Sequence, residues 1–241
     1  MDCRGDYDTI KAWGGAHGVV ILARYDEDAE DISSTGGKPP CRIVESLKSL
    51  NYQCLELLAQ QAAAGSTTSF ALGEVIREWQ QLDETARRRA ADYPFLLFDA
   101  GFADPQRWQQ LDAPRVSDGY PPAHAPFFTV PDAVAVTRSV FVFASSMAQR
   151  HRTYARLALG MHPQCVRIIA GHSVLHVHQM AEHWWSWLQP RWPHTPEIWR
   201  ELLMAGAEGG EIHRRARMHG MRLLEAHMAR AVRSRSGGSG P

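Results

Sequence analysis

Apolar residues recur at three- and four-residue steps along most of the chain, which is the spacing of the buried face of an amphipathic helix. The clearest run lies within 42–64, with apolar side chains at Ile43, Leu47, Leu50, Cys54, Leu57, Leu58 and Ala62. The same spacing predicts further helices over 70–82, 83–92, 133–149, 152–159, 163–170, 173–187, 196–207 and 211–232. The alternation of apolar and polar residues that marks a half-buried strand is almost absent. The sequence therefore predicts an all-α fold.

Stretches rich in proline, glycine and serine divide the chain into segments. Residues 1–40 combine an acidic run with glycines and prolines, and we expect a weakly ordered arm there. Two helical domains should follow, one over 41–111 and one over 132–233, joined by a proline-rich linker at 112–131. The polar glycine- and serine-rich stretch at 234–241 predicts a disordered tail.

Charge is distributed unevenly between the two halves, although the formal net charge of the chain is zero. Residues 1–135 hold twelve basic and twenty acidic residues, whereas the remainder holds fourteen arginines, no lysine and six acidic residues. The halves therefore carry opposite charges of about −8 and about +8, which indicates that one half meets an anionic partner, the other half, or another copy of the chain.

Several classes of protein are disfavoured by the sequence. No apolar run approaches the roughly 20 residues of a membrane-spanning helix, and the acidic, polar start is unlike a signal peptide. The four cysteines form no CxxC pair, which favours reduced thiols in a cytoplasmic protein over a disulfide or metal framework. Because the sequence has neither a GxSxG motif nor a glycine-rich phosphate loop, we expect neither an enzyme nor a bound cofactor.

Two short predicted helices, 163–170 and 173–187, flank Gly171 and His172 and have the form of a helix–turn–helix. Ser173 is a good N-cap for the second helix. We expect that helix to place Ser173, His176, Gln179 and His183 on one face and Val174, Val177, Met180 and Ala181 on the other. An ordinary helical hairpin has the same pattern and is the alternative.

A helix that reads DNA needs polar side chains that reach base edges and flanking cations that hold phosphates. The candidate phosphate contacts are Arg150, Arg152, Arg156 and Arg167, with Arg191 as a further cation nearby. The candidates nearest the bases are His172, Ser173, His176 and Gln179.

Three further features of the basic half each allow both a structural and a functional interpretation. Five of the eight tryptophans lie close together in the sequence, and they predict either a packed aromatic cluster or a partner-binding surface: Trp184, Trp185, Trp187, Trp192 and Trp199. The spacing of His172, His176 and His183 would suit a zinc site on one helix face. No nearby cysteine or carboxylate completes the set of ligands, so an ordinary polar helix face is the favoured interpretation. The predicted helix over 211–232 carries an apolar stripe among arginines, which is typical of core packing or of a dimer contact.

The second half resembles the FlhD family, the small helical subunit of the flagellar master transcription activator. The matching residues are Met147, Ala148, Gln149 and Arg150, then Leu159, Gly160 and Met161, then Ile169 and Ala170, then Gln179, Met180, Ala181 and Glu182, then Arg191 and Trp192, then Ile212 and His213, and finally Arg222, Leu223 and Leu224. The resemblance covers roughly 136–230, and 43–60 faintly echoes the family's first helix.

This resemblance implies an all-α fold, a homodimer, and regulation of transcription through DNA, together with a partner subunit of the FlhC type. Family members are about half as long as this chain, so 1–130 has no direct counterpart. The cysteine of the family's intersubunit disulfide falls near Leu188 here, which argues against a covalent dimer.

The sequence therefore predicts one of two functions. The first is a FlhD-like transcriptional activator of the bacterial flagellum type, acting as a dimer or with a partner and touching DNA through its basic half. The alternative is a protein-interaction adaptor without DNA contact, in which the basic half docks on the acidic half or on an acidic partner and the tryptophans anchor the contact.

Overall fold

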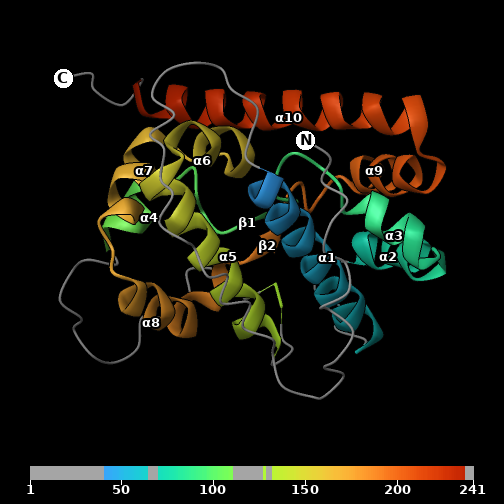
Figure 1. Cartoon of the computed structure of the whole chain (residues 1–241), viewed down its shortest axis with the longest axis horizontal. Coiled ribbons are helices and arrows are strands. Elements are labelled where there is room, and N and C mark those ends of the chain that lie inside the picture. Colours follow the sequence, from blue (N-terminus) through green and yellow to red (C-terminus); the bar gives the residue numbers. More distant parts are fainter. Residues whose placement is uncertain (1–40, 65–69, 111–126, 129–131, 237–241) are drawn as a thin grey trace.

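The computed structural model describes residues 41–64, 70–110, 127–128 and 132–236, which form ten helices and one pair of very short strands (Figure 1). The helices are α1 (Cys41–Ala63), α2 (Phe70–Gln81), α3 (Glu84–Ala90), α4 (Pro105–Gln110), α5 (Asp132–Arg150), α6 (Arg152–Leu159), α7 (Pro163–Ala170), α8 (Val174–Trp184), α9 (Pro196–Glu208) and α10 (Gly210–Ser236). A 3-10 turn, η2 (Trp185–Trp187), follows α8. The all-α prediction is confirmed. None of the helices in the described part is long and apolar enough to cross a membrane.

The helices are arranged around α1 and α5, which lie in the middle of the molecule (Figure 1). At one end α2 and α3 pack against α9, and at the other end α5 packs against α7 and α8. The long α10 runs along one edge of the molecule, and its C-terminal part lies over α6 and α7 in Figure 1.

The strands connect segments that are far apart in the sequence. Strand β1 (Phe98–Asp99) pairs antiparallel with β2 (Gln189–Pro190), with Phe98 opposite Pro190 and Asp99 opposite Gln189. The residues just before β1 are buried, so the sequence segment 95–98 passes through the interior as a non-helical, bent chain.

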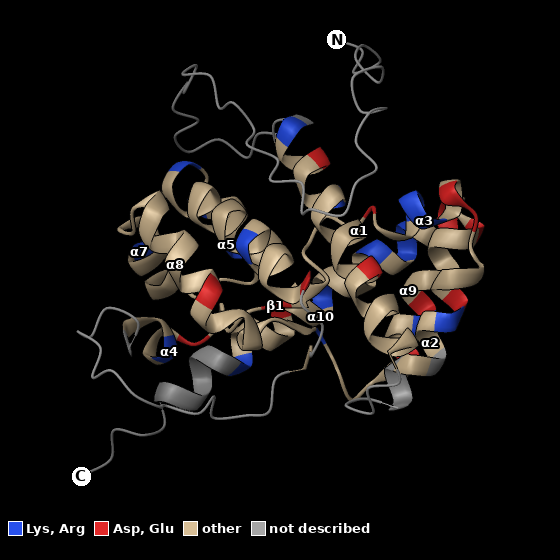
Figure 2. Cartoon of the chain, turned by 90° about the horizontal axis from the view of Figure 1, so that it is seen from below, with Lys and Arg blue, Asp and Glu red and all other residues tan. Residues whose placement is uncertain are grey.

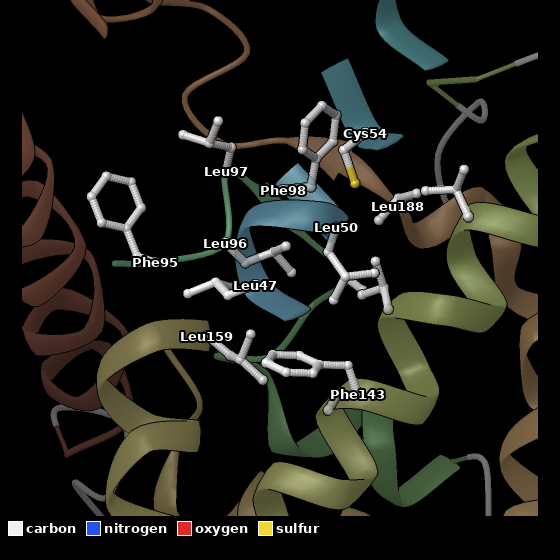
Figure 3. Packing of buried hydrophobic residues seen from close by; sticks show 14 of the residues in the cluster. Leu47, Leu50, Cys54, Phe95, Leu96, Leu97, Phe98, Phe143, Leu159 and Leu188 are labelled. Carbon is white, nitrogen blue, oxygen red and sulfur yellow. The ribbon is translucent and has the colours of Figure 1, made fainter. Parts of the chain in front are cut away.

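One hydrophobic core includes side chains from both halves of the chain (Figure 3). Leu50 and Cys54 of α1 lie in the same cluster as Phe143 of α5 and Leu159 of α6. The expected division into a domain over 41–111 and a domain over 132–233 is therefore corrected. The change in charge marks a change in the surface, whereas the apolar faces of the two halves are buried against each other.

Part of the expected linker also belongs to this core. Phe128 is fully buried and stacks on Phe98, with 6.0 Å between the ring centroids. Apart from Phe127 and Phe128, the 112–131 segment lies outside the described residues, as does the arm at 1–40. At the C-terminus α10 continues to Ser236, so the first three residues of the expected tail are helical and only 237–241 lie outside the described part.

Two buried polar side chains fix the non-helical segment 95–98 in the core. The Asn51 amide donates to the carbonyls of Ala91 and Phe95, at 3.2 and 3.0 Å, and its oxygen accepts from the Leu97 N–H at 2.9 Å. The Arg191 guanidinium donates from Nε to the Leu96 carbonyl at 2.7 Å and from Nη2 to the Leu159 carbonyl at 2.6 Å. Because an unpaired buried peptide group is costly, these bonds allow a non-helical chain to cross a helical core.

Candidate polyanion-binding surface

The predicted helix pair is present as α7 and α8, joined by a three-residue turn from Gly171 to Ser173. The Ser173 hydroxyl accepts from the His176 N–H at 3.2 Å, so the expected N-cap is confirmed. The Gln149 amide donates to the carbonyls of Ala170 and His172, at 3.4 and 3.3 Å. The C-terminal end of α5 is thereby attached to the turn, which brings Arg150 close to the start of α8.

The outer face of α8 differs from the predicted one. Val177, Met180 and Ala181 are buried, as expected. Val174, expected on the same buried face, is 64% exposed, and the neighbouring Leu175 is 70% exposed. The N-terminal turn of α8 therefore presents aliphatic side chains to the surface of the described part.

The four residues expected nearest the bases are placed differently from one another. Ser173 and Gln179 are exposed, and His176 is half-buried. His172 is only 8% exposed, and its ring packs against that of His176 with the centroids 4.7 Å apart. The assignment of His172 to base contact is thus corrected, because a residue inside the turn of a helical corner is enclosed by both helices.

The four arginines predicted to hold phosphates, Arg150, Arg152, Arg156 and Arg167, are all exposed on the outside of α5, α6 and α7. The structure adds Arg222 and Arg230 of α10, which are also exposed. A Cβ placed on Gly160, at the end of α6, would lie 2.7 Å from Leu224 Cδ1, so α10 passes directly over that end of α6. We call the set Arg152, Arg156, Arg167, Arg222 and Arg230 the arginine surface.

The arginine surface has no anionic partner within the described part of the chain. No described carboxylate lies within 4.0 Å of a guanidinium nitrogen of any of the five. Within the described part of the chain, these five positive charges are not neutralised by a carboxylate. Guanidinium groups offer planar, charged N–H donors, which match the oxygens of a phosphate.

Several other arginines form ion pairs. Arg88 contacts Glu84 at 2.8 Å, and Arg214 and Arg215 contact Glu211 at 2.6 and 3.6 Å. Pairs across the two halves join Arg200 to Glu78 at 3.1 Å, Arg217 to Asp92 at 3.9 Å and Arg191 to Asp99 at 3.6 Å. In Figure 2 acidic and basic residues are mixed on α2, α3 and α9. Positive charge is thus compensated at this end of the molecule.

The tryptophan cluster is mainly a core element. Trp187 and Trp199 are buried, and Trp199 donates from Nε1 to the Arg191 carbonyl at 2.6 Å. Trp184, Trp185 and Trp192 are half-buried and pack against the same core. Trp187 packs against Trp108 and Trp184, and Trp199 packs against Phe98. The structure therefore agrees with a packed aromatic cluster, and partner binding by the half-buried tryptophans stays a prediction.

The histidines of α8 are not gathered around a common point. His183 Nδ1 lies 2.8 Å from the Gln179 carbonyl, whereas the His176 ring is turned toward His172. Within the described ranges, no three or more histidine, cysteine or carboxylate side chains are grouped so that they could hold a metal ion.

Sequence reasoning missed Arg222 and Arg230 as members of the surface, and also the exposure of Val174 and Leu175. A helical projection of 211–232 could have separated the arginines from the buried face. The exposure of an aliphatic pair at a helix start depends on the neighbouring helices and has no local signal.

Comparison of the chain with protein-family models, with curated proteins and with solved structures gives no match. The resemblance to the FlhD family therefore stays a prediction that depends on the residues quoted above.

Proposed function

We propose that this chain is a DNA-binding transcriptional regulator that contacts the duplex through the phosphates, using the arginine surface. The observation that carries the proposal is the set of five exposed arginines on α6, α7 and α10 that lack a described carboxylate partner, whereas Arg88, Arg214 and Arg215 are paired. The resemblance to the FlhD family supports the same function, including a homodimer and a partner subunit of the FlhC type.

Recognition of sequence by this chain alone should be weak. Two of the four candidate base contacts, Ser173 and Gln179, are exposed, and the Ser173 hydroxyl already caps α8. Phosphate contacts give affinity without sequence information, whereas base-edge contacts give specificity. We therefore propose that a partner subunit or a second copy supplies most of the selectivity.

The proposal is tested by fluorescence anisotropy with the full chain and a short mixed-sequence duplex. The variant Arg152→Gln, Arg156→Gln, Arg167→Gln removes three charges from the arginine surface. Its matched control, Arg88→Gln, Arg214→Gln, Arg215→Gln, removes three exposed arginines that are ion-paired. We expect the affinity of the first variant to fall at least tenfold and that of the control to change little, since removing one phosphate-binding arginine weakens binding by roughly 1 kcal/mol or more.

Absence of duplex binding by the unaltered chain would contradict the proposal. Equal losses of affinity in the two triple variants would also contradict it, because binding would then depend on total charge alone and not on this surface.

A second candidate is a protein-interaction adaptor, and the exposure of Val174 and Leu175 favours it. Aliphatic side chains that are exposed together at a helix start are unusual unless another molecule covers them. Association of the separated halves does not distinguish the two functions, because the halves share a core. Leu175→Ser does distinguish them, since it should weaken an adaptor contact and leave phosphate-driven DNA binding unchanged.

A further inference from the structure

A small pocket opens where β1, β2 and α10 meet, away from the outer faces of α6 and α7. It encloses about 70 Å³ and is lined chiefly by Asp99, Gln189, Arg191, Trp192, Leu224 and His227. Since one water needs roughly 10–15 Å³ of such space, the pocket has room for about five non-hydrogen atoms. Its walls are apolar on the Trp192 and Leu224 side and polar on the Asp99, Arg191 and His227 side.

The strongest donor in the pocket is Arg191, which is only 5% exposed. Its Nε and Nη2 atoms already donate to the carbonyls of Leu96 and Leu159. Nη1 makes no hydrogen bond within the described part of the chain, and its nearest charged partner, Asp99 Oδ1, is 3.6 Å away. A buried guanidinium with spare N–H groups at a cavity is a site that a ligand oxygen can complete.

The neighbouring groups make an anionic ligand acceptable. The Asp99 oxygens accept from the N–H groups of Gly101 and Phe102, at 3.1 and 3.3 Å, so this carboxylate is already solvated by the backbone. His227 is exposed on α10 and makes no hydrogen bond within the described residues. Partial desolvation lowers the pKa of its ring, an effect that Asp99 opposes and the Arg191 and Arg230 charges reinforce. Either charge state of the ring offers at least one N–H donor to a ligand oxygen. Arg230 adds positive charge at the same end of α10.

The backbone at the pocket wall is held in an unfavourable conformation. Trp192 has a φ of 51°, the one non-glycine residue in the left-handed region among the described residues, and a proline follows it. Such a conformation costs about 1–3 kcal/mol and persists only when the surroundings impose it. Here the Arg191 N–H donates to the Leu97 carbonyl at 2.9 Å, and the Thr195 N–H donates to the Trp192 carbonyl at 3.0 Å. The indole is thereby fixed as one wall.

We propose that this pocket binds a small organic carboxylate, whose oxygens accept from Arg191 Nη1 and from His227 and whose short apolar chain packs against Trp192 and Leu224. The pocket shares α10 with the arginine surface, since Arg230 lies near His227, but Arg152, Arg156 and Arg167 do not line it. Its ligand class follows from the Arg191 Nη1 donors, which make no hydrogen bond within the described part of the chain, and from the size of the apolar part.

The probe for the test is propionate, which has five non-hydrogen atoms, and the neutral control ligand is propionamide. Both are titrated into the full-length ¹⁵N-labelled chain while the indole N–H signals are followed, with Trp192→Phe assigning the signal of Trp192. We expect propionate to shift that signal to saturation and propionamide to bind at least several-fold more weakly, because it lacks the charge.

Variants of α10 test the assignment of His227. His227→Ala should weaken propionate binding roughly tenfold, and His227→Gln, which keeps a donor, should recover most of it. The matched control His219→Ala changes a histidine that pairs with Glu201 outside the pocket, and it should leave the affinity unchanged. A non-saturating shift, equal binding of propionamide, or equal affinity in His227→Ala would overturn the proposal.

Discussion

Gly206→Ala tests the packing of α3 against α9, where the two halves of the chain come closest. A Cβ at Gly206 would lie 2.4 Å from Ala90 Cα, 2.6 Å from Ala90 Cβ and 2.7 Å from Ala90 N. Carbon atoms in contact are normally about 3.5–4.0 Å apart, so the helices would have to separate by roughly 1 Å. The Arg89 guanidinium resists this movement, because it donates to the carbonyls of Gly206 and Ala207 at 3.0 and 2.9 Å.

The expected magnitude follows from two opposing effects. Replacing a helical glycine by alanine gains up to about 1 kcal/mol of helix propensity. Overpacking against a backbone costs about 1–3 kcal/mol, here at the upper end because no flexible side chain can move aside. The net result is a decrease of about 1–2 kcal/mol in the free energy of unfolding.

The assay is urea denaturation followed by circular dichroism. Gly73→Ala is the matched control, since a Cβ at this position of α2 meets nothing within 4 Å. That variant should gain roughly 0.5–1 kcal/mol. If both substitutions stabilise the protein to the same extent, the close approach of α3 and α9 is refuted.

Three further predictions concern buried groups. Arg191→Met should lower the free energy of unfolding by about 3–5 kcal/mol, because it leaves the Leu96 and Leu159 carbonyls unpaired and breaks the buried pair with Asp99. The control Arg200→Met breaks a partly exposed pair with Glu78 and should lower the free energy of unfolding by less than about 1 kcal/mol. Burial lowers the pKa of His213 below its ordinary 6.5 in the folded protein. As the pH falls, the unfolded chain therefore binds a proton at this histidine before the folded protein does. Stability in urea should therefore fall as the pH drops below about 6.5, and His213→Gln should make that fall smaller; an unchanged pH dependence would exclude His213 as its source. Burial also raises the pKa of Cys54, and Cys165 is equally buried. In a variant whose other two cysteines are replaced by serine, a thiol reagent should therefore label neither residue in the native protein and both residues in urea.

Local chemistry was sufficient to predict most of the helices. The three- and four-residue spacing of apolar side chains and the short-range caps are properties of neighbouring residues, and the Ser173 cap, which accepts from the His176 N–H at 3.2 Å, lies where the sequence predicts it. Helix ends defined by glycine or proline were also close to those observed. The exception is the helix expected over 173–187, which turns into η2 after Trp184.

The arrangement of the helices was not predictable in the same way. The charge difference between the halves suggested two domains, but charge describes the solvent side of a helix and contains no information about what its apolar side covers. Arg191 illustrates the problem, since its position among prolines and tryptophans suggested a surface cation, whereas it is the buried partner of Leu96 and Leu159. Long-range partners of this kind depend on the whole fold.

The candidate site was predicted in part. The exposure of Arg152, Arg156 and Arg167 follows from their places on the polar faces of short helices, and the structure agrees. The burial of His172 does not follow from its polarity, because it results from the corner between α7 and α8.

The central claim is that the arginine surface holds phosphates, and the salt dependence of DNA affinity measures this most directly. Affinities for one duplex are determined between about 50 and about 200 mM salt for the unaltered chain and for the two triple variants. We predict that the variant at Arg152, Arg156 and Arg167 has a shallower slope, by roughly 0.9 log units per log unit of salt for each phosphate that is no longer neutralised, while the ion-paired control keeps the original slope. Identical slopes in all three proteins would contradict the account.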